Sequence, residues 1–416
     1  MAGEATLHQL LKQMVEMGAS DLHLTTNSPP MVRLDGRLIP LPYPPLTVAE
    51  TKQISYSVLT DSQKHRFEEN LELDFSFGVK GLARFRANNF MQRGAVGGVY
   101  RQIPYQILGF RELGLPPVVE LLCDKPRGLI LVTGPTGSGK TTTQAAMIDK
   151  INREKQLHII TIEDPIEFLL RDKKSIINQR ELGVDTETFV GALKSALRQD
   201  PDVILVGEMR DFETIETAIM AAETGHLVLS TLHTLDATET INRIISAFPP
   251  YQQKQVRLQL GSVLKGVISQ RLVPRADGKG RVPAIEVLLA TGRVRELIED
   301  KERTKEVPDA IAQGHLSYGM QTFDQSLMGL LKSNLITYDE ALRQATNPDD
   351  FALRVSGVSG TSDLKWESFE RSPEGSAARR STSSRSTRVP TASSTTSTRS
   401  ARRSGACRIA SSRAAG

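Results

Sequence analysis

The sequence predicts an α/β protein in which a parallel, doubly wound sheet follows a small α+β domain. Its 416 residues are 39% hydrophobic, which is enough to build sizeable cores. Short apolar runs alternate with helical segments from about residue 118 onward, whereas strands with alternating apolar and polar side chains fill much of residues 1–105. A Gly-rich loop between an apolar run and a helix is the third feature that supports this fold class.

Residues 1–105 are expected to form the α+β domain. Apolar residues at helical spacing predict a helix from Leu7 to Met17, and a short strand is expected at Asp21–Leu24. An alternating stretch interrupted by Asp35-Gly36 predicts a hairpin. Thr47 and Asp61 are the expected N-caps of two further helices. Further strands are predicted at residues 73–78, 83–90 and 98–103.

A connector at residues 106–117 separates this domain from a second one, expected at residues 118–350. Runs that are apolar on both faces and separated by helices are typical of parallel strands. They occupy residues 129–132, 158–162, 203–206 and 227–230, and residues 283–289 are expected to add a strand. The stretch at residues 293–342 is expected to be mostly helical.

Residues 351–416 are expected to be a disordered, Arg/Ser-rich tail, because its last part has almost no bulky apolar groups. A translated frameshift is the alternative. From Arg371 to Gly416 there are ten Arg and one acidic residue, a net charge of +9, so the total of +4 leaves −5 for the first 370 residues. The basic pI therefore gives no indication that the folded part binds nucleic acid.

Cysteine content and hydropathy restrict the class of protein further. Cys123 and Cys407 are the only cysteines, which excludes a disulfide scaffold or a four-cysteine zinc site and suits a reducing compartment. The first residues lack the basic flank and apolar stretch of a signal peptide, and no apolar run is long enough for a transmembrane segment. We therefore expect a cytoplasmic protein.

The Gly-rich loop has the pattern G-x-x-x-x-G-K-[ST], which is typical of a phosphate-binding loop. Glycines let backbone N–H groups turn inward around phosphate oxygens, Lys140 reaches the β and γ phosphates, and the Thr141 hydroxyl binds Mg²⁺. A predicted helix starts near Lys140, and its N-terminal dipole favours the phosphates. The residues expected to bind ATP are Gly134, Pro135, Thr136, Gly137, Ser138, Gly139, Lys140, Thr141 and Thr142.

Enzymes with such a loop use an acid at the end of a neighbouring strand. The apolar run from Val203 ends at Glu208, which we expect to polarise the attacking water, although Gly207 stands where an Asp is usual. Glu163 is expected to position Mg²⁺ or water, with Asp164 as an alternative. For each acid, a plain surface position at a strand end is the competing interpretation.

Two histidines flank the next apolar run. His233 follows the run and is expected near the nucleotide, because ligands bind at the carboxyl edge of α/β sheets. A neutral imidazole there can donate to the γ-phosphate or to Glu208. For His226, a purely structural role is equally compatible with the sequence. Their odd separation in the chain puts the two histidines on opposite faces of a regular strand, which argues against a shared metal site.

Arginines recur in the first domain, at Arg84, Arg86, Arg93 and Arg101. Arg84 and Arg86 share one face of an alternating strand. From the residues alone, a solvated sheet face is the favoured interpretation. The alternative is an arginine that another domain or subunit supplies to a phosphoryl group during transfer.

Four motifs, in this order, resemble those of the secretion-superfamily ATPases, the motors of type II secretion and type IV pili. They are a Walker A loop at residues 134–141, an Asp box at 161–167, a Walker B strand at 200–211 and a His box at 224–234. Residues 18–24 and 319–327 are similar to the pilus-retraction ATPases of this family in particular. The resemblance covers about residues 5–350.

The resemblance implies a ring-shaped homohexamer with a PAS-like N-terminal domain, a RecA-like C-terminal domain and ATP bound between them. It implies that Glu208 is the catalytic glutamate, with supporting roles for Glu163, His226 and His233. It also implies arginine fingers at Arg86 and Arg101, with Arg93 a weaker candidate, which reverses the interpretation given above. Thr141 and Glu163 are then the expected Mg²⁺ site.

The resemblance also indicates a biological role. The chain lacks the long N-terminal region and the four-cysteine module of assembly and secretion ATPases. A family motif, Ala-Ile-Arg-Asn-Leu-Ile-Arg-Glu, is only partly retained at residues 293–300. We expect an ATPase that powers pilus retraction at an inner-membrane platform protein, on the cytoplasmic face. Alternatives are an accessory retraction paralogue, a pilus-assembly or type II secretion ATPase, and a nucleic-acid-binding protein that acts through the tail.

Overall fold

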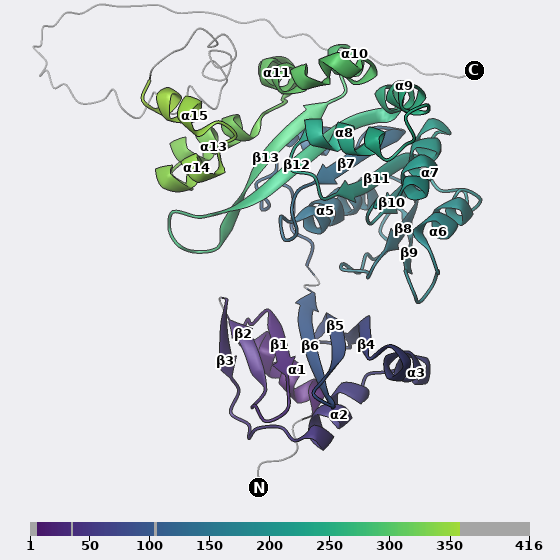
Figure 1. Ribbon diagram of the computed structural model, residues 1–416, viewed down its shortest axis with the longest axis vertical. Helices are drawn as coiled ribbons and strands as arrows, with labels where there is room; N and C mark the ends of the chain where they lie inside the picture. The colour runs from purple at the N-terminus through teal and green to yellow at the C-terminus, as the bar shows by residue number, and fades with distance from the viewer. Residues whose placement is uncertain (1–5, 35, 104–105, 358–416) are drawn as a thin grey trace, which may run out of the picture. The chain divides into compact units, whose positions relative to one another are not determined.

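The computed structural model describes residues 6–34, 36–103 and 106–357 (Figure 1). The tail after residue 357 and Asp35 of the expected hairpin lie outside these residues. The described chain contains a six-stranded sheet and a seven-stranded sheet, which confirms an α/β fold with a mixed sheet. In the part of the chain that is described, no helix combines the length and the apolar character needed to cross a membrane.

The six-stranded sheet is antiparallel throughout and has the order β3-β2-β1-β6-β5-β4. Its strands are β1 (Asp21–Leu24), β2 (Met31–Leu34), β3 (Arg37–Pro40), β4 (Glu72–Val79), β5 (Ala83–Gln92) and β6 (Ala95–Ile103). Buried side chains of its core include Leu10, Leu11, Met14, Phe85 and Tyr100. The alternation predicted for these strands is present: along β5 the apolar residues are buried and Arg84 and Arg86 are partly exposed on the other face.

Three helices belong to the same part of the chain: α1 (Leu7–Glu16), α2 (Val48–Tyr56) and α3 (Asp61–Asn70). Each begins with a capping box in which a Thr side chain accepts the N–H of the third helical residue. Thr47 is the predicted cap of α2. The prediction of Asp61 as a cap was wrong, because Thr60 caps α3 and Asp61 lies in the first turn, where its charge favours the helix dipole.

The seven-stranded sheet has the order β13-β12-β7-β11-β10-β8-β9. All neighbouring strands are parallel except β13, which pairs antiparallel with β12 at one edge. The strands are β7 (Gly128–Thr133), β8 (His158–Glu163), β9 (Ile176–Glu181), β10 (Val203–Val206), β11 (Leu227–Leu232), β12 (Leu264–Pro274) and β13 (Arg281–Leu289). The sequence predicted five of them and missed β9 and β12.

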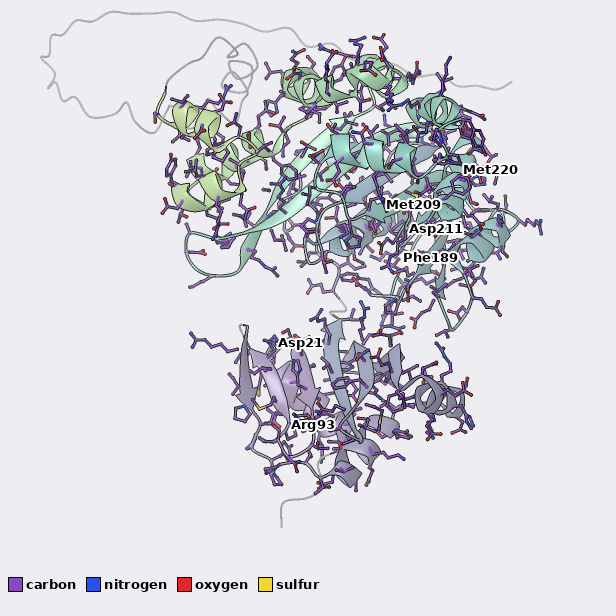
Figure 2. The ribbon with its side chains drawn as sticks, in the orientation of Figure 1. Asp21, Arg93, Phe189, Met209, Asp211 and Met220 are labelled. Atoms are coloured by element: carbon purple, nitrogen blue, oxygen red, sulfur yellow. The ribbon has the colours of Figure 1, made fainter. Side chains whose placement is uncertain are left out.

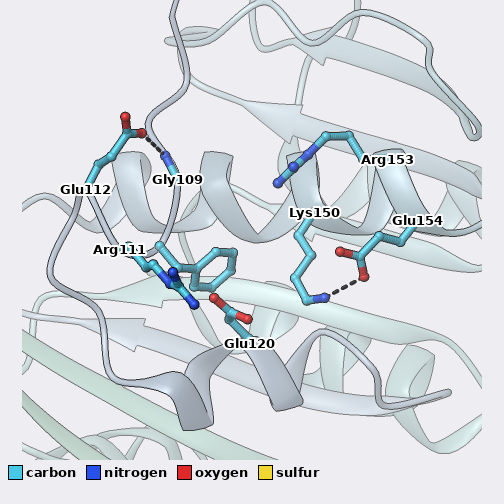
Figure 3. A pocket seen from close by; sticks show the side chains of 8 residues that line it. Gly109, Arg111, Glu112, Glu120, Lys150, Arg153 and Glu154 are labelled. Atoms are coloured by element: carbon cyan, nitrogen blue, oxygen red, sulfur yellow. Dashed lines mark hydrogen bonds and ion pairs between the residues drawn. The ribbon is translucent and has the colours of Figure 1, made fainter.

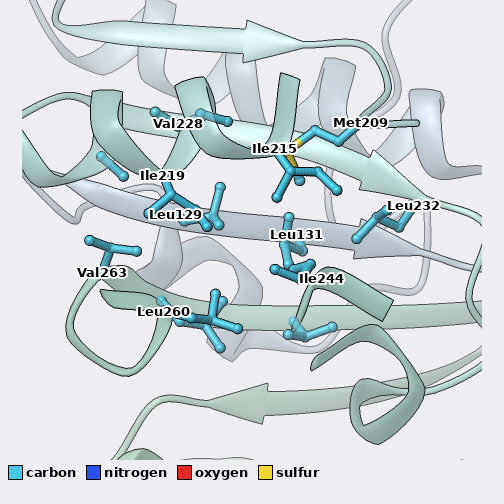
Figure 4. Close-up of a cluster of buried hydrophobic side chains, with 14 of the residues drawn as sticks. Leu129, Leu131, Met209, Ile215, Ile219, Val228, Leu232, Ile244, Leu260 and Val263 are labelled. Carbon is cyan, nitrogen blue, oxygen red and sulfur yellow. The ribbon is translucent and has the colours of Figure 1, made fainter. Parts of the chain in front are cut away.

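Helices cover both faces of this sheet. One apolar cluster packs helices α4 (Pro117–Leu122) and α5 (Lys140–Glu154) against one face. A second cluster covers the opposite face with six helices, and Figure 4 shows side chains of this cluster between the strands and the helices. These helices are α6 (Phe189–Ala196), α7 (Phe212–Glu223), α8 (Ala237–Ser246), α9 (Gln253–Val263), α10 (Gly292–Glu299) and α11 (Val307–Gln313). The two layers exclude water from strands β7, β8, β10 and β11, so nearly every residue of these strands is buried.

The last part of the described chain consists of short helices, as the sequence predicted for residues 293–342. They are the 3-10 helix η1 (Lys301–Glu306) and the helices α11 (Val307–Gln313), α12 (His315–Tyr318), α13 (Phe323–Lys332), α14 (Tyr338–Gln344) and α15 (Pro348–Val355). Helix α15 extends past residue 350, where the folded part was expected to end. Its N-cap Asn347 accepts the N–H of Asp350, and its Phe351 is buried in a separate apolar cluster.

Candidate nucleotide-binding and catalytic site

The phosphate loop connects the buried strand β7 to helix α5, in the predicted strand–loop–helix context. Gly134, Gly137 and Gly139 all have positive φ, a conformation that side chains with a Cβ rarely adopt. A Cβ on Gly134 would lie 2.3 Å from the carbonyl oxygen of Gln270. The loop therefore requires glycine for its backbone conformation and also for its close approach to strand β12.

The side chain of Lys140 is folded into this loop. Its Nζ donates to the carbonyl oxygens of Gly134 at 2.9 Å and Pro135 at 3.1 Å. Burial lowers the pKa of Lys140, although the carboxylates of Glu208 and Glu167 act in the opposite direction. Ser138 Oγ is buried without a hydrogen-bond partner among the described residues. A cationic Lys and an unpaired hydroxyl inside a glycine cradle fit the oxygens of a nucleotide phosphate.

Gln270 of β12 forms hydrogen bonds that hold the phosphate loop in place. The sequence analysis did not identify this residue. Its Nε2 donates to Ser138 O at 2.6 Å, and its Oε1 accepts from Thr143 Oγ1 of α5 at 2.9 Å. One buried amide thus ties the loop to the first turn of the helix that follows it. Gln270 was not found because the sequence analysis did not predict strand β12, in which it lies among other polar residues.

Glu208 and His233 meet at the carboxyl edge of the sheet. Glu208 follows β10 and His233 follows the adjacent parallel strand β11, so the two strand ends lie side by side. His233 Nε2 lies 3.2 Å from Glu208 Oε1, and Arg210 Nη2 lies 2.7 Å from Glu208 Oε2. Burial acts to raise the pKa of Glu208, but Arg210 and His233 outweigh it and hold that pKa below its usual value. Glu208 is therefore an ionised, oriented carboxylate.

Glu163 ends strand β8, which pairs with β10, the strand before Glu208, on the side away from the phosphate-loop strand β7. Its Oε1 accepts from Thr161 Oγ1 at 2.7 Å and from Gln179 Nε2 at 3.1 Å. Burial raises the pKa of Glu163, and these hydrogen bonds reduce that effect. The described residues contain no group of three or more His, Cys, Asp or Glu that is arranged to hold a metal ion by itself. Thr141 lies in the first turn of α5, as a hydroxyl ligand in a phosphate loop must.

His226 lies at the other edge of the sheet. It precedes β11, and its carbonyl oxygen accepts the N–H of Gly128, the first residue of β7. Its ring Nδ1 is 2.8 Å from the carbonyl oxygen of Ala221 at the end of α7. The structure therefore separates His226 from Glu208 and His233 by the length of a strand, and the geometry favours the structural role over the catalytic one.

Two of the candidate arginines of the first domain, Arg86 and Arg101, contact acidic residues of the same chain. Arg86 and Arg101 are direct neighbours across β5 and β6. Arg101 Nε lies 2.7 Å from Oδ1 of the buried Asp21, while 67% of the Arg101 side chain stays exposed. Arg86 Nη1 is 4.0 Å from Glu167 Oε1. The weaker candidate Arg93 is in the β5–β6 turn, and Figure 2 shows it at the opposite end of this sheet from Asp21.

A hollow of about 350 Å³ lies beside the C-terminal part of α5, away from the phosphate loop at the start of that helix (Figure 3). Its charged lining consists of three basic and three acidic residues: Arg111, Lys150, Arg153, Glu112, Glu120 and Glu154. Lys150 pairs with Glu154, and Glu112 accepts the N–H of Gly109. Because these charges balance, the lining of the hollow does not favour an anion such as a nucleotide phosphate.

Comparison with known proteins decides the family. The family model described as "Type II/IV secretion system protein" matches residues 3–317. The chain belongs to this type II/IV secretion family. It is 49% identical over 343 residues to the "Type IV pilus retractation ATPase PilT" of Pseudomonas aeruginosa, covering 82% of this chain and 99% of that protein. It is 47% identical over 324 residues to a "Twitching motility protein" of Neisseria gonorrhoeae, covering 78% and 86%.

A solved structure of a family member agrees with this result. The crystal structure of the pilus retraction motor PilT with bound ADP has a TM-score of 0.78 and 50% identity, covering 83% of this chain and 99% of that one. The predicted recognition of a secretion ATPase of the pilus-retraction type is therefore confirmed. The ADP in that relative also agrees with the assignment of a nucleotide site.

Proposed function

We propose that this secretion-family member is a homohexameric ATPase motor that hydrolyses ATP to power type IV pilus retraction. The observation that carries the proposal is the convergence of the phosphate loop, Glu208 and His233 at one edge of the sheet, in a chain 49% identical to a pilus retraction ATPase. The proposed architecture is a PAS-like N-terminal domain at residues 1–105, a connector at 106–117 and a RecA-like domain at 118–350.

ATP binding is assigned to the loop from Gly134 to Thr142. Its backbone N–H groups and Lys140 Nζ would hold the phosphate oxygens, and Lys140 would exchange its contacts with loop carbonyls for contacts with phosphate. Mg²⁺, when bound, supplies charge neutralisation at the β and γ phosphates. Its proposed protein ligand is Thr141, with Glu163 positioning it or its water.

Glu208 is the proposed group that orients the attacking water and accepts its proton. The low pKa of its carboxyl keeps it ionised at neutral pH, so it can accept a hydrogen bond from water on approach. His233 and Arg210 each occupy one carboxylate oxygen, which fixes the plane of the group. His233 is thus proposed as the residue that positions Glu208, and the supporting role that resemblance gave to His226 is not part of this proposal.

Arg86 and Arg101 are proposed to complete the site of a neighbouring subunit. Their position side by side on β5 and β6, and the exposure of Arg101, support a role toward a group outside their own chain. An arginine that reaches a γ-phosphate from a neighbour stabilises charge in phosphoryl transfer. ATP would then bring adjacent subunits together, and hydrolysis would release them.

The motor would act on the cytoplasmic face of the inner membrane, against a platform protein of the pilus machinery. The test is complementation of a piliated strain that lacks its retraction ATPase. We expect the wild-type chain to restore twitching and to reduce the number of surface pili, and Glu208→Gln to do neither. Restoration of twitching by Glu208→Gln, or an increase in pili with the wild-type chain, would contradict the proposal.

A further inference from the structure

The loop that carries His233 is held in place by a buried carboxylate on a different part of the sheet. This loop, residues 233–236, joins the end of β11 to the start of α8. Glu286 lies on β13, and its Oε1 accepts the N–H of Ala237, the first residue of α8, at 2.8 Å. That N–H belongs to the first helical turn and has no partner within the helix. Glu286 therefore fixes the point where the loop enters α8.

The same carboxylate is linked to the phosphate loop. Glu286 lies directly opposite Ser269 of β12 in the antiparallel register, so the two side chains are neighbours on one face of the sheet. Thr133 Oγ1, at the end of β7, lies 3.1 Å from Ser269 Oγ. Thr133 immediately precedes Gly134. Two buried hydrogen bonds, Thr133 to Ser269 and Ala237 to Glu286, are thus joined by a cross-strand pair, and together they connect the residue before the phosphate loop with the first residue of α8.

Other hydrogen bonds connect the loop at residues 233–236 with the first turn of α8, so the loop and this turn move together. Thr234 Oγ1 is 2.6 Å from Thr240 Oγ1, and the Leu235 N–H donates to Glu239 Oε2 at 2.7 Å. The Asp236 side chain caps α8 by accepting the N–H of Glu239 at 2.8 Å. The loop is therefore fixed to the first turn of α8. A displacement of that turn carries His233 with it.

We infer that Glu286 is a positioning residue that sets the distance of His233 from Glu208 by anchoring the start of α8 to the strand that leads into the phosphate loop. The inference rests on the proposed roles of His233 and Glu208. The Glu286 side chain is buried in β13, and a buried carboxyl costs free energy unless hydrogen bonds compensate it. Its contacts connect the loop that carries His233 with the strand that leads into the phosphate loop.

The test is a double-mutant cycle in the full-length protein. Glu286→Ala should lower kcat on the order of tenfold, with KM for ATP and the Kd for a fluorescent ADP unchanged, because a displaced neighbour weakens an oriented group without weakening binding. In a His233→Ala background the same substitution should cost less than about twofold, since the group that Glu286 positions is already gone. An equal loss in both backgrounds would overturn the inference.

A second variant removes only the hydrogen bond. Ala237→Pro deletes the N–H donor, and proline is well tolerated at the first position of a helix. The extended backbone of Asp236 suits a residue before proline. This variant should reproduce the kcat loss of Glu286→Ala, and combining the two should add nothing. Wild-type kcat in Ala237→Pro would overturn the inference even if Glu286→Ala did not fold.

The control is Asp324→Ala, which also removes a carboxylate that accepts a backbone N–H, that of Thr346, at 2.7 Å. Asp324 lies on α13, away from the two loops, so this variant should lose thermal stability and keep its kcat. A His233→Ala protein with wild-type kcat would refute the proposed role of His233 and the inference with it. If His233→Ala lowers kcat and Glu286→Ala lowers it by the same factor in the wild-type and His233→Ala backgrounds, the inference about Glu286 is refuted, while the proposed role of His233 stands.

Discussion

His233 Nε2 lies 3.2 Å from Oε1 of Glu208, across the ends of two adjacent parallel strands. The other carboxylate oxygen of Glu208 is held by Arg210 at 2.7 Å. Residues 25 positions apart in the sequence thus form one unit, since parallel strands place their carboxyl ends at the same edge. In this arrangement, the His233 ring contacts one oxygen of a carboxylate that must keep a fixed orientation toward water.

The first prediction concerns His233. Replacement by Ala should lower kcat between about tenfold and a hundredfold, because Glu208 loses one of its two fixed donors, while the Kd for ADP stays within about twofold. The measurement is steady-state ATP hydrolysis together with fluorescent ADP titration. His158→Ala is the matched control, because His158 begins β8 at the opposite edge of the sheet. A tenfold weaker ADP affinity in His233→Ala would show that His233 serves binding instead.

The second prediction concerns Gln270. Gln270→Ala removes both hydrogen bonds that connect the phosphate loop with α5, and leaves Ser138 O and Thr143 Oγ1 without their partner. Each lost bond of a buried group costs about 1–3 kcal/mol, so the Kd for ADP should rise about tenfold or more. Gln259→Ala, which breaks a surface contact with Glu223, should leave that Kd unchanged. Wild-type affinity in Gln270→Ala would show that the loop holds its shape without this support.

The third prediction tests the arginines. Arg101→Ala and Glu208→Gln should each form rings without ATPase activity, because each removes one half of every site. Mixed rings should recover activity, since a site with an intact Glu208 can then face a neighbour with an intact Arg101. Arg93→Ala should be active on its own, because Arg93 lies in the turn at the far end of its sheet. Mixed rings that stay inactive would place Arg101 outside the neighbour's site.

The site was predictable where the chemistry is local in sequence. The glycine loop, Lys140 and Thr141 follow from the spacing within eight residues, and Glu208 and His233 follow from their positions directly after apolar strands. The position of each of these residues is determined by the strand or helix next to it in the sequence. Sequence patterns report such short-range geometry well, because the strand that precedes a residue also determines the edge of the sheet at which it lies.

Gln270, Ser269 and Glu286 could not be found in this way. They lie on β12 and β13 and act on segments more than 40 residues away. Strand β12 was missed because polar side chains interrupt its apolar pattern, and those side chains are the ones that contact the phosphate loop and its supports. His226 shows the converse: the resemblance implied a supporting role, and its position before β11 places it at the opposite edge of the sheet from Glu208.

The fourth prediction concerns stability and pH. Burial raises the pKa of Glu286 to about 7, with Asp236 adding to the increase and the Ala237 N–H, Arg271 and Ser269 opposing it. A carboxyl whose pKa is raised in the folded state binds its proton more tightly there. Its contribution to stability is full below about pH 4.5, the value for an unperturbed Glu, and is lost as the pH rises through 7.

Glu286→Gln removes this titration. Relative to wild type, the variant should therefore gain up to roughly 3 kcal/mol in free energy of unfolding between pH 5 and pH 8. Urea denaturation of both proteins at the two pH values gives the comparison. Burial also raises the pKa of Asp324. Asp324→Asn, measured in the same way, therefore shows how much this second carboxyl contributes to the pH dependence of the free energy of unfolding. A constant difference between Glu286→Gln and wild type across this range would contradict the raised pKa.

The measurement that tests the account most directly is ATP binding and turnover by Glu208→Gln. The substitution keeps the size and hydrogen-bonding capacity of the side chain but removes the basic carboxylate. We predict that this variant binds ATP with the affinity of the wild-type protein and that its kcat falls about a hundredfold or more. Hydrolysis at the wild-type rate would contradict the assignment of Glu208 as the group that activates water, and with it the site built around the Glu208–His233 pair.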